Sequence, residues 1–322
     1  MRILVTGGAG FIGSNIVESL LADQDIEQVR VLDNLVTSSI DNIAEFYASS
    51  KFEFIQDDIR DYSTCLQACD GIDLITHQAA LGSVPRSIND PLTTNEVNIG
   101  GTLNVFTAAK EKKVKRIVYA ASSSTYGDHP ALPKVEDEIG KPLSPYAVTK
   151  YVNELYADVF ARLYNTEFIG LRYFNVFGPR QNPKGPYAAV IPLFTESFLN
   201  GQAPVINGDG NHSRDFTYVS NVVQANLLAL FTENKAAVNQ VYNIGYGQQT
   251  SLLQLVQYLK RISASDIEPI QAPERTGDVK HSLADISKAK NLLGYNPAVS
   301  VEEGLKKTFR WYKKKAEVTF KD

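Results

Sequence analysis

The sequence has few of the residues that stabilise small secreted domains or hold metals. Among 322 residues there are 2 cysteines and 4 histidines. Cys65 and Cys69 stand close together with no histidine beside them, which argues against a disulfide framework and a zinc site. The histidines show no metal-ligand spacing, so no metal site is expected. This cysteine usage fits a reducing compartment, and we expect a cytoplasmic protein.

An excess of one charge and long apolar runs are also absent. The chain has 32 Lys+Arg and 36 Asp+Glu, a net charge of −4, which argues against nucleic acid or a membrane surface as a partner. No run of about 20 apolar residues occurs, so no membrane span is expected. The first residues lead directly into glycines, and we expect no signal peptide.

Short apolar runs alternate with stretches of helical length through the first half of the chain. The predicted strands are residues 3–5, 29–32, 52–56, 74–77, 116–120 and 166–172, and later 241–245. The predicted helices include residues 14–23, 98–111, 146–164, 214–230, 251–262, 285–293 and 301–316. This alternation predicts an α/β fold, a doubly wound parallel sheet with helices on both faces.

A glycine-rich turn follows the first predicted strand. Gly7, Gly10 and Gly13 have the spacing G-x-x-G-x-x-G, which suits a tight turn that brings free amides close to a phosphate. Asp33 ends the second strand, where its carboxylate would accept the ribose hydroxyls of NAD and repel the extra phosphate of NADP. Asn34, not an arginine, follows it. A plain strand–helix turn is the alternative, but this setting predicts NAD binding.

Acidic, aromatic and hydroxyl side chains follow other predicted strands. Asp58 and Ile59 come after the third strand, where they would hold adenine; the alternative is a solvated acid at a strand end. Residues 122–124 are serines at the end of the fifth strand, where parallel sheets bind ligands, although a serine-rich turn is the alternative. Tyr146 and Lys150 share one helix face, and an ammonium there, helped by a positive nicotinamide ring, would lower the pKa of the tyrosine. A tyrosinate would be a base for a sugar hydroxyl.

Taken in order, these motifs resemble the extended short-chain dehydrogenase/reductase family. The matching segments run from Gly7 to about Asp285 and are GGAGFIG, DDIRD, HQAA, SSSTYGD, YAVTK, RYFNVFGPRQ and RDFTYVSN. Within this family the sequence is most similar to bacterial UDP-N-acetylglucosamine/UDP-N-acetylgalactosamine 4-epimerases. The resemblance implies an NAD-binding Rossmann domain, residues 1–176 with 214–247, and a smaller C-terminal α/β domain for the UDP-sugar, residues 177–213 and 248–322.

The resemblance also implies a mechanism. Tyr146 takes the proton of the sugar 4-hydroxyl while hydride passes from C4 to NAD⁺, and the 4-keto intermediate turns and receives the hydride on its other face. Lys150 bonds the nicotinamide ribose, and Ser122 or Ser124 relays the proton, with the choice open. The cofactor contacts that it implies are Gly7, Gly10, Phe11, Ile12, Gly13, Asp33, Asn34, Asp58, Ile59, Gln78, Ala79, Ala80, Asn98, Tyr146, Lys150 and Tyr173.

Substrate contacts follow from the same resemblance. Arg214 and Arg275 match arginines that clamp the UDP phosphates, a role that suits the guanidinium fork. Ser282 stands where relatives restricted to UDP-glucose and UDP-galactose carry tyrosine, which leaves room for an N-acetyl group. The other implied contacts are Ser123, Ser124, Asn175, Ala189, Val190 and Asp278.

Several alternatives remain open at this stage. UDP-glucose and UDP-glucuronate are rival substrates. A decarboxylase or dehydratase is disfavoured because those relatives carry glutamate where Ser124 stands, and a non-catalytic NAD-binding scaffold is disfavoured because Tyr146 and Lys150 are both present. Gly82 stands where some relatives have lysine near the pyrophosphate. The helix of residues 146–164 has an apolar stripe too wide for one seam, and the resemblance implies a homodimer through it.

Overall fold

A parallel sheet forms the centre of the molecule. The computed structural model describes residues 1–183, 188–274 and 280–319, and its large sheet has the strand order β11-β6-β5-β4-β1-β2-β3. The strands are β1 (Arg2–Thr6), β2 (Gln28–Leu32), β3 (Phe52–Ile55), β4 (Leu74–His77), β5 (Arg116–Ser122), β6 (Glu167–Tyr173) and β11 (Gln240–Ile244). All pair in parallel. The predicted doubly wound α/β fold is confirmed.

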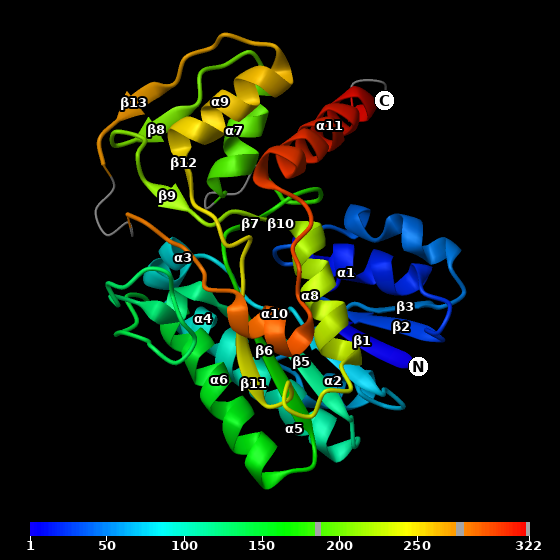
Figure 1. Cartoon of the computed structure of the whole chain (residues 1–322). Helices are drawn as coiled ribbons and strands as arrows, with labels where there is room; N and C mark the ends of the chain where they lie inside the picture. The colour runs from blue at the N-terminus through cyan, green and yellow to red at the C-terminus, as the bar shows by residue number, and fades with distance from the viewer. Residues whose placement is uncertain (184–187, 275–279, 320–322) are drawn as a thin grey trace.

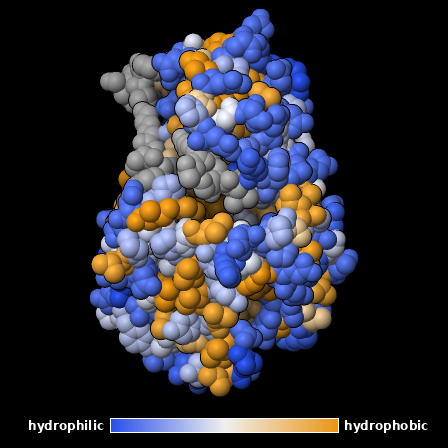
Figure 2. Space-filling model, turned by 90° about the vertical axis from the view of Figure 1, so that its left-hand side faces the viewer, coloured by the Kyte–Doolittle hydropathy of each residue, from blue (hydrophilic) through white to orange (hydrophobic). Residues whose placement is uncertain are grey.

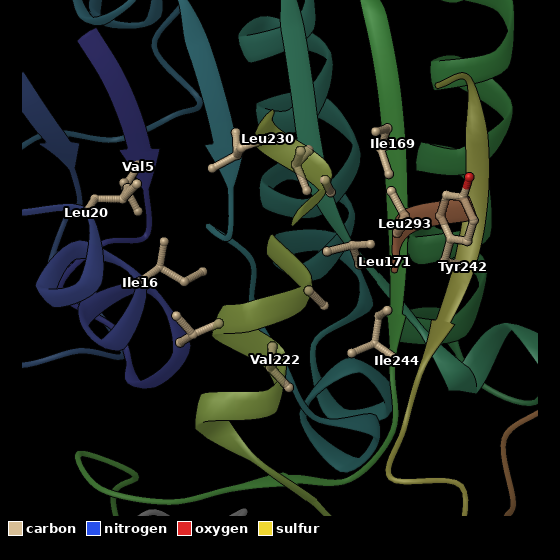
Figure 3. Packing of buried hydrophobic residues seen from close by; sticks show 14 of the residues in the cluster. Val5, Ile16, Leu20, Ile169, Leu171, Val222, Leu230, Tyr242, Ile244 and Leu293 are labelled. Carbon is tan, nitrogen blue, oxygen red and sulfur yellow. The ribbon is translucent and has the colours of Figure 1, made fainter. Parts of the chain in front are cut away.

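Helices cover both faces of this sheet (Figure 1). One layer comprises α1 (Phe11–Ala22), α8 (Val219–Phe231) and α10 (Ser287–Leu293), and the other comprises α2 (Tyr62–Ala68), α5 (Thr102–Glu111) and α6 (Pro145–Leu163). In the first layer Ile16 and Val222 point from their helices toward the strands, and Leu293 lies beside Tyr242 (Figure 3). Successive residues of β1 and β4, Ile3–Val5 and Leu74–Ile75, are apolar because these strands are buried on both faces.

The chain between β4 and α5 contains more helix than the sequence predicts. The short helices α3 (Val84–Asn89) and α4 (Pro91–Asn95) lead into a π-helical segment, Glu96–Gly101. Further short helices are Ile40–Asn42, Ala44–Ala48 and Ser123–Tyr126. The predicted helix 98–111 is therefore α-helical only from Thr102 onward.

A second group of elements stands beyond the carboxyl edge of the sheet (Figure 1). It comprises α7 (Val190–Leu199), α9 (Leu252–Ser263) and α11 (Val301–Thr319), with the strand pairs β7 (Val176–Phe177) and β10 (Thr217–Tyr218), β8 (Val205–Asn207) and β13 (Ile270–Ala272), and β9 (Ser213–Arg214) and β12 (Thr250–Ser251). Phe194, Leu255 and Leu305 belong to its own apolar cluster. The exact division into two domains stays a prediction. Within the described ranges, no helix combines the length and apolar character that a membrane crossing requires.

Helix α6 is held in place by a cap and by a buried ion pair. Ser144 accepts the amide of Ala147 at 3.1 Å, which satisfies one free donor of the first turn. Further along α6, Glu154 accepts two hydrogen bonds from Arg172 of β6, at 2.9 and 2.7 Å, and both side chains are buried. This forked pair fixes α6 against the sheet.

We predict that Glu154→Ala lowers the free energy of unfolding by about 3 kcal/mol, because it leaves the Arg172 guanidinium buried without its partner. Asp158→Ala is the matched control on the same helix, since it removes a pair with Arg162 that is exposed on both sides; it should cost less than about 1 kcal/mol. Urea denaturation followed by circular dichroism measures both. Equal losses would contradict the importance of the buried pair.

Candidate functional site

The glycine-rich turn joins β1 to α1 and packs tightly against the end of β4. The backbone of Gly7 has φ +69°, and a Cβ there would lie 2.6 Å from the amide nitrogen of Ala79. A Cβ at Gly13 would lie 2.1 Å from the carbonyl oxygen of Gly7. Glycine is therefore required at both positions, and the turn leaves the amides at the start of α1 open to an anion.

Asp33 lies at the end of β2 with its carboxylate almost fully buried. One oxygen accepts the amide of Leu35 at 2.9 Å and the hydroxyl of Ser38 at 2.7 Å, and the other accepts the amide of Ala9 at 3.0 Å. A carboxylate offers about four acceptor positions, so one remains for a ribose hydroxyl. The turn and this carboxylate together fit the dinucleotide that the sequence predicts.

A cleft of about 490 Å³ runs along the carboxyl edge of the sheet, within the usual range for small-ligand sites. It brings together predicted cofactor and catalytic residues from distant parts of the chain. These are Gly7, Gly10, Phe11, Ile12, Gly13, Asp33, Asn34, Ile59, Gln78, Ala79, Ala80, Ser122, Tyr146, Lys150 and Tyr173.

Ser122 stands between the other hydroxyl groups of the cleft. It is the register partner of Tyr173 at the ends of β5 and β6, and its side chain accepts the hydroxyl of Ser124 at 2.9 Å. The Ser122 side chain also acts on Tyr146, because it favours the ionised form of the tyrosine hydroxyl and lowers its pKa. Ser124 lies one step further from the tyrosine, outside the cleft lining, and Ser123 is half-buried beside it. The geometry thus favours Ser122 as the immediate neighbour of Tyr146.

Burial has opposite effects on the pKa of Tyr146 and on the pKa of Lys150. Burial raises the pKa of the Tyr146 hydroxyl, and the Ser122 side chain only partly offsets this. The Lys150 ammonium lies 6.0 Å from the centre of the Tyr146 ring and donates to the carbonyl of Ala120 at 2.8 Å. Burial lowers the pKa of Lys150 to about 8, against the opposing charge of Glu154. For the chain's own groups desolvation therefore dominates. That Lys150 lowers the pKa of Tyr146 with a positive nicotinamide ring beside it stays a prediction.

Two predicted cofactor residues lie outside the cleft lining. Asp58 bonds Arg60 and Asn34 instead, and the hydrogen bond from Arg60 lowers the pKa of Asp58 to about 2. Asn98 is fully buried; its amide group bonds the backbone of Leu81 at 2.7 and 3.1 Å. Both residues hold neighbours that line the cleft.

Some lining residues escape sequence reasoning. Arg60 and Arg86 both line the cleft. In the sequence, Arg60 is marked only by its place in the segment DDIRD. In the structure, its guanidinium forms ion pairs with Asp58 and Glu96.

Of the predicted substrate residues, Val190 and Arg214 lie in the second group of elements. Asn175 follows β6 and is exposed, and Ala189 and Val190 form the start of α7. Arg214 ends β9 and donates to the carbonyls of Ser213 and Lys280 at 3.0 and 3.1 Å. Ser282 is half-buried, and its amide donates to the carbonyl of Ser213 at 3.1 Å. Arg275 and Asp278 lie outside the described residues.

Comparison with known proteins gives the same assignment. The model of the NAD dependent epimerase/dehydratase family matches residues 3–245. The UDP-glucose 4-epimerase of Mycolicibacterium smegmatis is 38% identical over 98% of this chain and 100% of its own length. The structure of UDP-glucose 4-epimerase from Thermotoga maritima with UDP-glucose has a TM-score of 0.91 and 39% identity, covering 98% of this chain and 100% of that one.

A third relative differs in its named substrate. The UDP-N-acetylglucosamine 4-epimerase from Methanobrevibacter ruminantium, solved with UDP-N-acetylmuramic acid, has a TM-score of 0.92 and 39% identity, covering 98% of both chains. These matches confirm the predictions of an extended short-chain dehydrogenase/reductase and of an isomerase that depends on NAD. The cleft, the glycine turn and the family match lead to one conclusion: the chain belongs to the NAD dependent epimerase/dehydratase family.

Proposed function

We propose that this protein is a 4-epimerase that interconverts UDP-N-acetylglucosamine and UDP-N-acetylgalactosamine. One observation carries the proposal: Tyr146 and Ser122 line the same cleft as the glycine turn and Asp33. A hydroxyl acid/base thus lies in the same cleft as the dinucleotide site, as the abstraction of a sugar hydroxyl proton beside a nicotinamide requires.

Each group of the cleft has a distinct role in this reaction. Tyr146 takes the proton from the sugar 4-hydroxyl, and Ser122, oriented by Ser124, aligns that hydroxyl. Lys150 is fixed by the carbonyl of Ala120 and supplies positive charge to the cleft. Bound NAD, held by the glycine turn and Asp33, would accept hydrogen from sugar C4 and return it.

The sugar is proposed from two features of the sequence and from the relatives. No carboxylate occurs in residues 122–127, which speaks against the carbon acid chemistry of decarboxylases and dehydratases. Ser282 is small and half-buried, and it stands where relatives restricted to UDP-glucose and UDP-galactose carry tyrosine, which supports an acyl group at sugar C2. The likeness to a UDP-N-acetylglucosamine 4-epimerase supports this substrate, whereas the relatives that act on UDP-glucose keep that sugar as the alternative.

We also propose that the protein acts as a homodimer through α6. Val148, Leu155 and Leu163 lie along one face of this helix and are 46%, 49% and 66% exposed. The neighbouring helices α3 and α4 add Ile88 and Leu92, which are exposed as well. Hydrophobic side chains gather on this side of the molecule (Figure 2). A second copy related by a twofold axis would cover the face with the same residues.

Tyr146→Phe should reduce the rate of epimerisation by at least about 100-fold, because it removes the hydroxyl that exchanges the proton. Tyr156→Phe is the matched control, since it removes a hydroxyl from the same helix away from the cleft lining. Coupled assay of product formation with both variants tests this. Full activity of Tyr146→Phe would rule out its role, and a wild-type protein that binds NAD but converts no UDP-sugar would point to the scaffold alternative.

Ser282→Tyr should abolish conversion of UDP-N-acetylglucosamine and leave conversion of UDP-glucose, because the ring fills the space for the acyl group. The measurement is an assay of wild type and variant with UDP-N-acetylglucosamine, UDP-N-acetylgalactosamine, UDP-glucose and UDP-glucuronate. Activity of the wild type on UDP-glucuronate or UDP-glucose alone would refute the proposed substrate.

Leu155→Arg should convert the protein from a dimer to a monomer of 35.5 kDa, because it places a charge in the apolar face. Arg162→Ala, an exposed change on the same helix, should leave the dimer intact. Light scattering at micromolar concentration measures the molar mass of the wild type and of both variants. A monomeric wild type would show that α6 is not a dimer interface.

A further inference from the structure

Asp215 is a buried carboxylate that accepts hydrogen bonds from three backbone amides. It lies between β9 and β10 and is fully buried. One oxygen accepts the amide of Tyr246 at 2.8 Å, and the other accepts the amides of Gly247 at 3.0 Å and Ala284 at 3.1 Å. A single side chain therefore joins the loop after β11 to the segment that precedes α10.

These contacts lie next to the proposed substrate contacts. Arg214 is the residue before Asp215, and Ser282 stands two residues before Ala284. The segment around Ser282 is tied to Ser213 as well: the Ser282 amide donates to the Ser213 carbonyl, and the Ser213 hydroxyl bonds the ring of His281 at 2.8 Å. The position of Ser282 relative to Arg214 thus depends on the groups that surround Asp215.

Burial makes the charged form of the Asp215 carboxyl group unfavourable. No salt bridge to Asp215 is found in the part of the chain that the structure describes, and burial raises its pKa to about 6. The surroundings nevertheless fit a carboxylate closely, because a Cβ on Gly245 would lie 2.8 Å from one of its oxygens. An asparagine has the same shape, but its amino group would face an amide donor in place of an acceptor. The amides of Tyr246, Gly247 and Ala284 donate to the two oxygens of Asp215, so both oxygens must be acceptors.

We propose that Asp215 is a positioning residue of the UDP-sugar site. Its carboxylate fixes the segment that carries Ser282 against the strand that carries Arg214, and so sets the affinity for the UDP-sugar without contact with it. This inference rests on the proposed function of the cleft and extends it to a residue outside the cleft lining.

Asp215→Asn tests the proposal by separating substrate affinity from catalysis. The KM for UDP-N-acetylglucosamine should rise about tenfold, since an amide is left without its acceptor. The kcat should stay within about threefold, because Tyr146, Ser122 and Lys150 are untouched. The amount of NAD that copurifies with the protein should not change.

Two further variants distinguish positioning from general destabilisation. Gly245→Ala pushes on the same carboxylate and should raise the KM in the same way, so the test survives if Asp215→Asn does not fold. Asn221→Asp is the control: this buried side chain bonds the backbone of Val299 at 2.8 and 3.1 Å, away from Ser282. It should lower the melting temperature but leave the KM unchanged. The proposal is overturned if the KM is unchanged in both test variants. It is also overturned if all three variants show a lower kcat, a higher KM and less bound NAD.

Failure of the proposed function gives a different result. If the wild type converts no UDP-sugar, calorimetric titration with UDP alone takes the place of the kinetic assay. Binding about tenfold weaker to Asp215→Asn than to the wild type supports the positioning role. Equal binding, or none to the wild type, contradicts it.

Discussion

The parallel pairing of β1 with β4 and of β5 with β6 is the constraint on which the cleft depends. It places Thr6 beside His77 and Ser122 beside Tyr173, so that four strand ends meet at one edge of the sheet. The glycine turn leaves β1 at this edge. A slip of one residue in either pair would reverse the side chains of a whole strand, and a slip between β5 and β6 would separate Ser122 from Tyr173.

Burial decides the chemistry available at this edge. The same low-dielectric surroundings raise the pKa of Tyr146 and lower that of Lys150 to about 8, so each group is closer to its neutral form than it would be in water. The opposing influence on Lys150 comes from Glu154, which is itself paired with Arg172. The charge state of the cleft is therefore linked to the packing of α6 on β6.

Local patterns made much of the fold and site predictable. The strand–helix alternation gave the sheet, and the spacing of glycines and of Tyr146 and Lys150 gave the turn and one helix face, because each depends on nearby residues. Contacts between residues far apart in the sequence could not be predicted from these local patterns. The cleft position of Arg60, the binding of Asn98 to Leu81 and the three amides around Asp215 all depend on segments that meet only in the folded chain. The effect of burial on the pKa of Tyr146 was missed for a related reason, since a sequence shows a neighbouring charge more readily than it shows burial.

The central claim is that the hydrogen at sugar C4 leaves and returns within one closed cleft while Tyr146 exchanges only the hydroxyl proton. The most direct test is to incubate the protein, without added cofactor, with UDP-N-acetylglucosamine that carries deuterium at C4, and to examine the product by NMR. The account predicts UDP-N-acetylgalactosamine that retains the deuterium at C4. Formation of the product with loss of that deuterium to water would contradict it.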